Sequence, residues 1–391
     1  MRPAGQTVGD KPSEFFVYFD DYQEAAARTD QNRRVGIEGL AFPLLGLFGE
    51  VGTLLSALKK KQRDQDSYVG YSEAVVEEFG DVLWYFSNVA SRASLSLGSL
   101  AEQVFDNRSD SNDSEQDSTG SNHSPEFEAA VIALAGKVGL LLNEFSAGKI
   151  GNNRDVLSAH LAKIFRSLSR AATVADVDLR QAAHNNICKI NSRWPRTRQY
   201  RPLFDTAYSD AEQLPRKIEM HIVETQVAGR TCVFQLCNGV EIGSRLTDNK
   251  VVEDDYRFHD VFHLANAAIL GWSPCLRALF RVKRKSRPEV DETQDGARAI
   301  LIEEGLSTFV FHHALRLNYF DSIKSLDYSL LKTVQDFVTG YEVDQCPLWQ
   351  WEQAILEGFE VFRKLRTHRR GVVTADLVER SITFRALPDD R

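Results

Sequence analysis

Apolar residues recur at three- and four-residue steps in two neighbouring stretches of the chain. The first stretch runs from Leu44 to Leu58 and the second from Val75 to Ala90. This spacing places the apolar side chains on one side of an α-helix. The polar segment KKKQRDQDSYVGYS separates the two stretches. The pattern therefore predicts two amphipathic helices that pack through their apolar sides.

The same plan recurs further along the chain. GKVGLLLNEFSAGK (136–149) aligns with GEVGTLLSALKKK (49–61), and AHLAKIFRSLSRAAT (159–173) aligns with EEFGDVLWYFSNVAS (77–91). The match lies in the apolar pattern and the small residues rather than in charge. Two units are too few for a solenoid, so we expect a pseudo-dimeric helical bundle in which each copy buries the apolar stripe of the other.

A polar linker separates the two copies. Residues 106–124, DNRSDSNDSEQDSTGSNHS, have no apolar residue and cannot bury a face, which predicts flexibility. We place the boundaries of the four predicted parts as follows: a first copy at 14–108, the linker at 109–125, a second copy at 126–200 and a C-terminal domain at 201–391.

The C-terminal domain has a different pattern. KIEMHIV (217–223), a VAGR turn and TCVFQL (231–236) predict a β-hairpin that VEIG (240–243) extends. Helical patterning resumes from about Tyr256 to His368, and VVTADLVERSITF (372–384) predicts a final strand. The whole chain is therefore predicted to be mainly α, with a helical pseudo-dimer followed by an α+β domain that holds a small antiparallel sheet.

Composition and charge limit the expected cellular location of the protein and the kinds of partner it binds. The net charge of −8 over 391 residues argues against binding nucleic acid by neutralising phosphates. The five cysteines show no C-x-x-C spacing, no signal peptide pattern is present, and no run of about 18 apolar residues exists. We therefore expect reduced thiols, no membrane span and a cytoplasmic location. A homo-oligomer is compatible with the sequence.

Three acidic residues form the first candidate site. Glu78 and Asp81 lie three residues apart, on one face of a helix, and Glu50 lies on the preceding helix. Asp81 stands in FGDVLWYF among apolar and aromatic neighbours, where a carboxylate needs a partner. Converging carboxylates repel one another, and a hard divalent cation removes that repulsion. Mg²⁺, with Mn²⁺ as the alternative, could then polarise a phosphoryl oxygen and activate water.

Segments around these acids resemble a known family. DYQEAAARTD (21–30), FPLLGLFGEVGTLLSALKKK (42–61) and EEFGDVLWYF (77–86) are similar to the MazG-like nucleotide pyrophosphohydrolases of the all-α NTP pyrophosphatase group. The resemblance implies an E-x-x-E pair and an E-x-x-D pair that together hold Mg²⁺. Carried over, the metal positions are Glu50, Thr53, Glu78 and Asp81. Thr53 departs from the family's glutamate and brings no charge, so metal affinity should fall.

The resemblance also implies an Asn followed by a Lys near the substrate phosphates. The first copy offers Asn107 but has Asp110 at the lysine position, whereas the second copy keeps Asn186, Lys189 and Arg193. The acidic positions of the second copy are replaced by Lys137, Leu140, His160 and Lys163. We therefore expect one composite site, to which the second copy lends phosphate contacts. Arg193 and Lys189 could instead simply end a surface helix.

Other residues have two interpretations each. Lys59 and Lys60 end the first helix, where they either stabilise the helix dipole or meet substrate phosphate. Trp84 either stacks on a nucleotide base or packs in the core. The basic cluster KRKS (283–286) is either a solvated loop or a loop that faces phosphate.

The C-terminal domain holds a second candidate site. His259 and His263 lie one helical turn apart, and Glu303 and Glu304 follow on a later helix. They either bind a transition metal or form part of the core. The region resembles a C-terminal domain appended to some MazG-like proteins.

The main hypothesis is a Mg²⁺-dependent hydrolase that converts a nucleoside triphosphate, its nucleotide partner, to the monophosphate and pyrophosphate. One alternative is a nucleotide sensor whose catalysis has been weakened by Thr53. The other is a metal-dependent hydrolase centred on His259 and His263.

Overall fold

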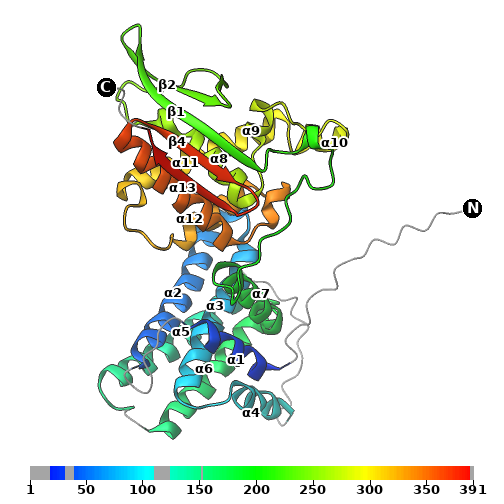
Figure 1. Ribbon diagram of the computed structural model, residues 1–391. Helices are drawn as coiled ribbons and strands as arrows, with labels where there is room; N and C mark the ends of the chain where they lie inside the picture. Colours follow the sequence, from blue (N-terminus) through cyan, green and yellow to red (C-terminus); the bar gives the residue numbers. More distant parts are fainter. Residues whose placement is uncertain (1–17, 31–38, 110–123, 151–152, 388–391) are drawn as a thin grey trace, which may run out of the picture. The chain divides into compact units, whose positions relative to one another are not determined.

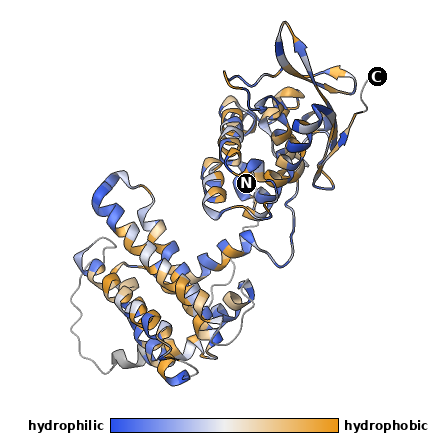
Figure 2. Cartoon of the chain, turned by 90° about the vertical axis from the view of Figure 1, so that its left-hand side faces the viewer, coloured by the Kyte–Doolittle hydropathy of each residue, from blue (hydrophilic) through white to orange (hydrophobic). Residues whose placement is uncertain are grey.

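The computed structural model describes residues 18–30, 39–109, 124–150 and 153–387. Most of the predicted linker, residues 110–123, lies outside them. The chain divides into two compact units, Met1–Trp194 and Pro195–Arg391. In Figure 2 the helices of both units carry hydrophobic residues along one side and hydrophilic residues along the other.

The described part of the N-terminal unit is helical (Figure 1). Helix α2 packs against α3 and α5, α5 packs against α6, and α7 packs against α1 and α3. The predicted apolar stripes form its core, with Leu47, Val51 and Phe79 fully buried. The elements are α1 (Phe19–Thr29), α2 (Ala41–Asp64), η2 (Gln65–Ser67), α3 (Tyr71–Arg92), α4 (Leu97–Ser109), α5 (Pro125–Ser146), α6 (Arg154–Val174) and α7 (Leu179–Arg193).

Two connections in this unit have the same backbone geometry. Helix α3 leads to α4 through Ser94 at φ 56°, and α6 leads to α7 through Asp176 at φ 56°. In each case the next amide closes the helix end, from Leu95 at 2.9 Å and from Val177 at 2.8 Å. The two halves thus follow one plan at these corners, while the tandem duplication itself stays a prediction.

Two helices of this unit, Ala41–Ser67 and Pro125–Ser146, are long and apolar enough to cross a membrane by length and composition. A core helix of a soluble protein meets the same criterion. Both contribute buried side chains, such as Leu47 and Leu134, to the shared core. Two such helices are weak evidence for a membrane span.

The C-terminal unit contains an antiparallel sheet with strand order β3-β2-β1-β4-β5. The predicted hairpin is present, with Ala228 and Gly229 both at positive φ in its turn. We expected one final strand over 372–384, but the chain turns at residues 377–380 and pairs with itself as a second hairpin. The strands are β1 (Lys217–Val227), β2 (Arg230–Cys237), β3 (Val240–Glu241), β4 (Arg370–Asp376) and β5 (Ser381–Ala386).

Helix α13 is central to this unit, since it contacts α8, η5 and the strands β4 and β5. Its Phe359 and Phe362 pack on Phe262 of α8. The helical elements are η3 (Asp210–Glu212), η4 (Tyr256–Phe258), α8 (Asp260–Ala265), the π-helical turn η5 (Asn266–Leu270), α9 (Pro274–Leu279), α10 (Pro288–Thr293), α11 (Ala297–Leu315), η6 (Asn318–Phe320), α12 (Tyr328–Phe337), η7 (Glu342–Gln345) and α13 (Leu348–His368).

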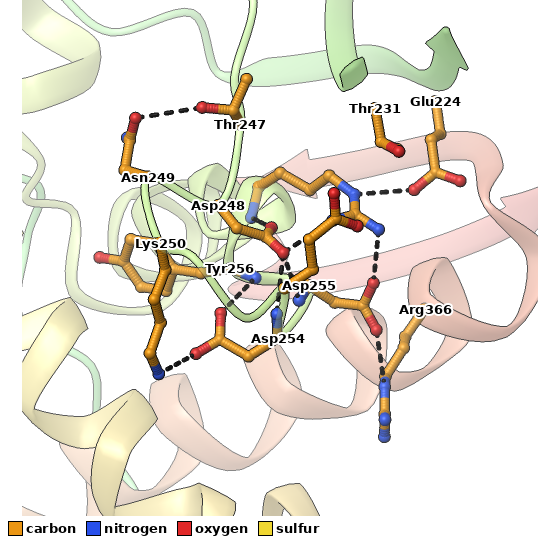
Figure 3. Close-up of polar contacts among 12 residues, drawn as sticks. Glu224, Thr231, Thr247, Asp248, Asn249, Lys250, Asp254, Asp255, Tyr256 and Arg366 are labelled. Carbon is orange, nitrogen blue, oxygen red and sulfur yellow. Dashed lines mark hydrogen bonds and ion pairs between the residues drawn. The ribbon is translucent and has the colours of Figure 1, made fainter. Parts of the chain in front are cut away.

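A buried ionic network fixes the loop before α8 (Figure 3). The guanidinium of Arg257 lies 2.7 Å from Asp248, 2.8 Å from Asp255 and 2.8 Å from Glu224 of β1. Arg366 of α13 adds a contact of 2.9 Å to Asp255. These carboxylates are satisfied by arginine and by backbone amides, so they bind the loop to the sheet and to α13.

The basic cluster at 283–286 faces solvent only in part. Arg284 is 1% exposed and holds the fully buried Asp295 at 2.7 Å and Glu342 at 2.7 Å. Ser286 donates hydrogen bonds to Glu212. Both sequence interpretations of this cluster, as a solvated loop and as a phosphate-facing loop, are therefore wrong for Arg284.

Candidate functional site

The three predicted acids meet in the N-terminal unit. Glu50 lies on α2 and Glu78 and Asp81 lie on α3, and one carboxylate oxygen of each lies within 4.8 Å of the others. The packing of α2 on α3 explains the convergence. Glu50 is followed immediately by the buried Val51, and Asp81 is preceded by the buried Gly80. Because these helix faces form the core, they place the three carboxylates at the edge of that core.

The surroundings oppose the charge of these acids. Burial first, and then the charges of Asp81 and Glu50, raise the pKa of Glu78 to about 8. Burial and then the charge of Asp81 also raise the pKa of Glu50. Burial raises the pKa of Asp81 against the opposing effect of Lys189. The Oε2 atom of Glu78 is enclosed and accepts no hydrogen bond from the described residues. Unsatisfied, mutually repelling oxygen donors are suited to a hard divalent cation.

Helix α7 completes the site with polar groups from the second half of the unit. The Nζ atom of Lys189 lies 2.5 and 2.6 Å from the two Asp81 oxygens and 3.3 Å from Glu77 Oε1. The Nδ2 atom of Asn186 donates to Asp81 Oδ1 at 2.7 Å. The hydroxyl of Tyr22 on α1 donates to Asn186 Oδ1 at 3.1 Å. The two halves therefore meet at Asp81.

A glycine permits this close approach of α7 to α3. A Cβ atom on Gly80 would lie 2.8 Å from the carbonyl oxygen of Ala182 and 2.9 Å from Asn186 Cβ. Both distances are shorter than atoms tolerate, so a larger residue would push α7 and its amide away from Asp81. Sequence reasoning missed Glu77 and Tyr22 as members of the site. Tyr22 lies within the DYQEAAARTD segment that carries the family resemblance, which was the available signal.

Thr53 lies one turn beyond Glu50 on α2. Its hydroxyl donates to the carbonyl oxygen of Gly49 at 3.0 Å and lies 3.5 Å from Glu50 Oε2. The hydroxyl is thus engaged by its own helix and supplies no charge to the acidic cluster.

Two predicted substrate contacts lie away from the acids. Lys59 and Lys60 are exposed on α2. They follow Glu50 by nine and ten residues, which corresponds to about 14 Å along a helix. The structure does not bring them to the carboxylates.

The next residues that were predicted to contact substrate lie in different surroundings. The indole Nε1 of Trp84 donates to Thr29 Oγ1 at 3.0 Å, and its ring meets Tyr85 edge-on at 4.8 Å between centroids. The guanidinium of Arg193 lies 4.3 Å from the ring centre of Trp194, one turn beyond Lys189. Asn107 lies in the part of α4 whose side chains are outside the described residues.

The four predicted residues of the C-terminal unit also converge. The Nδ1 atom of His263 lies 3.1 Å from Glu303 Oε1, and its Nε2 atom lies 3.4 Å from Glu304 Oε1. The Nε2 atom of His259 lies 3.7 Å from Glu304 Oε2. The Sγ atom of Cys275, which sequence reasoning missed, lies 3.8 Å from Glu304 Oε1. No local spacing pointed to Cys275, because its partners are brought there by packing of α9 on α11.

Comparisons with known proteins show what the chain is similar to. Residues 199–388 match the family model of the MazG C-terminal domain. The chain is similar to the Gene 37 protein of Mycobacterium phage L5, with 31% identity over 93 residues that cover 22% of this chain and 82% of the phage protein. No solved structure gives a significant match.

Proposed function

Since this chain is a MazG-related protein that carries a MazG C-terminal domain over residues 199–388, we propose that its N-terminal unit is a Mg²⁺-dependent nucleotide pyrophosphohydrolase. The substrate is a nucleoside or deoxynucleoside triphosphate, and the products are the monophosphate and pyrophosphate. The unit is inferred to be a tandem pair in which the first copy supplies acids and the second supplies an amide and an ammonium.

One observation carries the proposal. Glu50, Glu78 and Asp81 present oxygens within 4.8 Å of one another, and Glu78 keeps an enclosed oxygen that no described group satisfies. An arrangement of this kind is unfavourable without a cation, and carboxylate oxygens are the donors that Mg²⁺ prefers. When bound there, Mg²⁺ would neutralise charge on the carboxylates and the triphosphate and polarise a phosphoryl oxygen.

The chain's own residues have separate roles. The three carboxylates hold the ion. The amide of Asn186 donates a hydrogen bond to Oδ1 of Asp81 and so orients this carboxylate. The bond involves Oδ1 and leaves the second oxygen, Oδ2, free of the amide. Lys189 places a positive charge beside the ion site, where it can exchange Asp81 for a phosphate oxygen of the substrate. Tyr85, which interacts electrostatically with Glu50, provides aromatic surface for the base, and Trp84 meets the Tyr85 ring edge-on.

The proposal is tested with the full chain and a panel of ribo- and deoxyribonucleoside triphosphates. With Mg²⁺ present, at least one nucleotide should yield monophosphate and pyrophosphate in equal amounts, and chelation of the metal should stop the reaction. Release of orthophosphate, or no release above buffer, would contradict the proposal.

One contact favours the sensor alternative. Lys189 lies within 2.6 Å of both oxygens of Asp81, so an internal ammonium already neutralises part of the acidic cluster. A chain that binds nucleotide but does not hydrolyse it would support this alternative. Calorimetric binding measured on the same nucleotide panel separates the two functions.

Replacing Thr53 with glutamate should strengthen Mg²⁺ binding by roughly tenfold, since it adds a carboxylate one turn from Glu50. Turnover should be preserved or raised. The matched control is Thr53→Gln, which has the same length without the charge and should leave affinity near the wild-type value. Isothermal titration of Mg²⁺ into both variants checks this, and equal affinities for the two variants would contradict the charge argument.

Mg²⁺ binding should release a proton at neutral pH. Because the pKa of Glu78 is raised to about 8, this carboxyl is protonated at pH 7 in the metal-free chain and must ionise to bind the ion. The apparent affinity should therefore rise about tenfold per pH unit between about pH 6 and 8. For the same reason the metal-free chain should lose stability as the pH rises from the ordinary glutamate pKa towards 8.

The proton release is measured by titrating Mg²⁺ in two buffers with different ionisation enthalpies. Identical heats in the two buffers would show that no proton leaves, and would remove the assignment of Glu78 as a ligand that is protonated before metal binding.

A further inference from the structure

We propose that the C-terminal unit binds a zinc ion through His259, His263, Cys275 and Glu304. These residues come from three different elements, since the two histidines lie at α8, Cys275 on α9 and Glu304 on α11. The proposal is independent of the N-terminal acidic site.

The Glu304 carboxylate lies close to the other three proposed donors. Zinc binds histidine nitrogen at about 2.0 Å and cysteine sulfur at about 2.3 Å, which places neighbouring donors about 3.3 to 3.6 Å apart. The Glu304 carboxylate lies 3.4 Å from His263 Nε2, 3.7 Å from His259 Nε2 and 3.8 Å from Cys275 Sγ. The donor atoms of His259, Asp260 and His263, and those of His263, Cys275 and Glu303, also lie within 4.8 Å of one another, so His263 joins both groups beside Glu304.

Neighbouring groups direct the correct ring nitrogens towards the site. The Nδ1 atom of His259 lies 2.9 Å from the carbonyl oxygen of Tyr256, and a carbonyl only accepts, so this nitrogen carries the proton. Its Nε2 atom faces two carboxylates, with Asp260 Oδ1 at 3.2 Å and Glu304 Oε2 at 3.7 Å. The Nδ1 atom of His263 faces Glu303, which leaves Nε2 towards Glu304. In metal sites a carboxylate behind a histidine commonly fixes the ligand in this way.

Glu303 is itself held in place. It is 0% exposed and accepts hydrogen bonds from Asn266 Nδ2 at 3.2 Å, Ser273 Oγ at 3.0 Å and the Cys275 amide at 2.9 Å. The same contacts position the cysteine beside the imidazole. His263 is 2% exposed, and neither of its ring nitrogens makes a hydrogen bond with the described residues. A buried imidazole nitrogen without such a bond is the second indication of a missing ligand.

The donor set selects the kind of ion. Thiolate and imidazole are softer than the all-oxygen set of the N-terminal unit, and a mixed sulfur, nitrogen and oxygen site favours zinc over magnesium. The Glu304 side chain is 43% exposed, so the ion has access from solvent and one ligand that water can replace. The π-helical turn η5 begins three residues after His263, and such turns are frequent at functional sites.

The test uses the full chain after its metals have been removed. Zinc is titrated against a chromophoric chelator, and cobalt is used separately because a Co²⁺–thiolate bond gives a charge-transfer band. We expect one zinc per chain and a thiolate band with cobalt. Cys275→Ser should lose the band and weaken zinc binding at least about a hundredfold. Glu304→Gln, at a half-exposed position, should weaken it about tenfold without unfolding the chain.

Matched controls lie in the same unit. Cys237→Ser, in β2, and His312→Gln, exposed on α11, should bind zinc as the wild type does. Zinc binding by the wild type no tighter than by Cys275→Ser, or a cobalt complex without a thiolate band, would overturn the proposal. An equal loss of zinc binding in His312→Gln would also overturn the proposal. Nucleotide hydrolysis is measured on the same samples, so that failure of the N-terminal proposal is seen separately.

Discussion

Replacing Asp81 with asparagine should lower nucleotide turnover at least about a thousandfold, equivalent to about 4 kcal/mol of activation free energy. Asparagine preserves the shape of the side chain but removes one of three charges that hold the ion. It also leaves Lys189 without the carboxylate that it contacts at 2.5 Å. The measurement is pyrophosphate release at saturating Mg²⁺ and nucleotide.

The matched control for this variant is Glu73→Gln, an acid-to-amide change at an exposed position of the same helix. It should retain wild-type turnover. If Asp81→Asn also kept its turnover while remaining folded, the acids would not be the reactive centre.

Replacing Arg284 with methionine should lower the free energy of unfolding of the C-terminal unit by about 3–5 kcal/mol. The change leaves Asp295, which is 0% exposed, without the guanidinium that contacts it at 2.7 Å, and it also frees Glu342. Arg277, whose Nε lies 3.6 Å from Asp295, remains, but a buried carboxylate that loses its closest counter-charge is strongly destabilising. Hydrogen exchange of β1 and α13 peptides in increasing urea reports this unit separately from the other.

Lys285→Met provides the control, because Lys285 is the next residue and is exposed. It should alter stability by no more than about 0.5 kcal/mol. Similar losses for the two variants would mean that the ionic contacts of Arg284 contribute little, and that general loss of positive charge destabilises the loop.

Much of the helical unit could be predicted because its apolar residues recur periodically along the sequence. The stripe from Leu44 to Leu58 defines a face, and that face sets where Glu50 must lie. The family resemblance pointed to Asn186 and Lys189, and the structure places both at Asp81. Trp84 shows the limit of this reasoning, since its hydrogen bond to Thr29 spans two helices and has no sequence pattern.

Contacts between segments that are far apart in the sequence account for the other differences between the predictions and the structure. Arg284 stands among basic residues and looks solvated, yet Asp295 and Glu342 bury it. Cys275 has no ligand spacing of its own, because Glu304 reaches it from a helix that starts 22 residues later. Lys59 and Lys60 were offered as contacts to substrate phosphate, but helix rise carries them away from Glu50.

The link between Lys189 and Asp81 has a consequence for how activity depends on dilution. Both residues belong to one polypeptide, and Tyr22 and Asn186 join them within the same folded unit. No association equilibrium between separate molecules is therefore needed to complete this constellation. Specific activity at the acidic site should stay constant as the protein is diluted, whereas a centre shared between subunits would lose it below their dissociation constant.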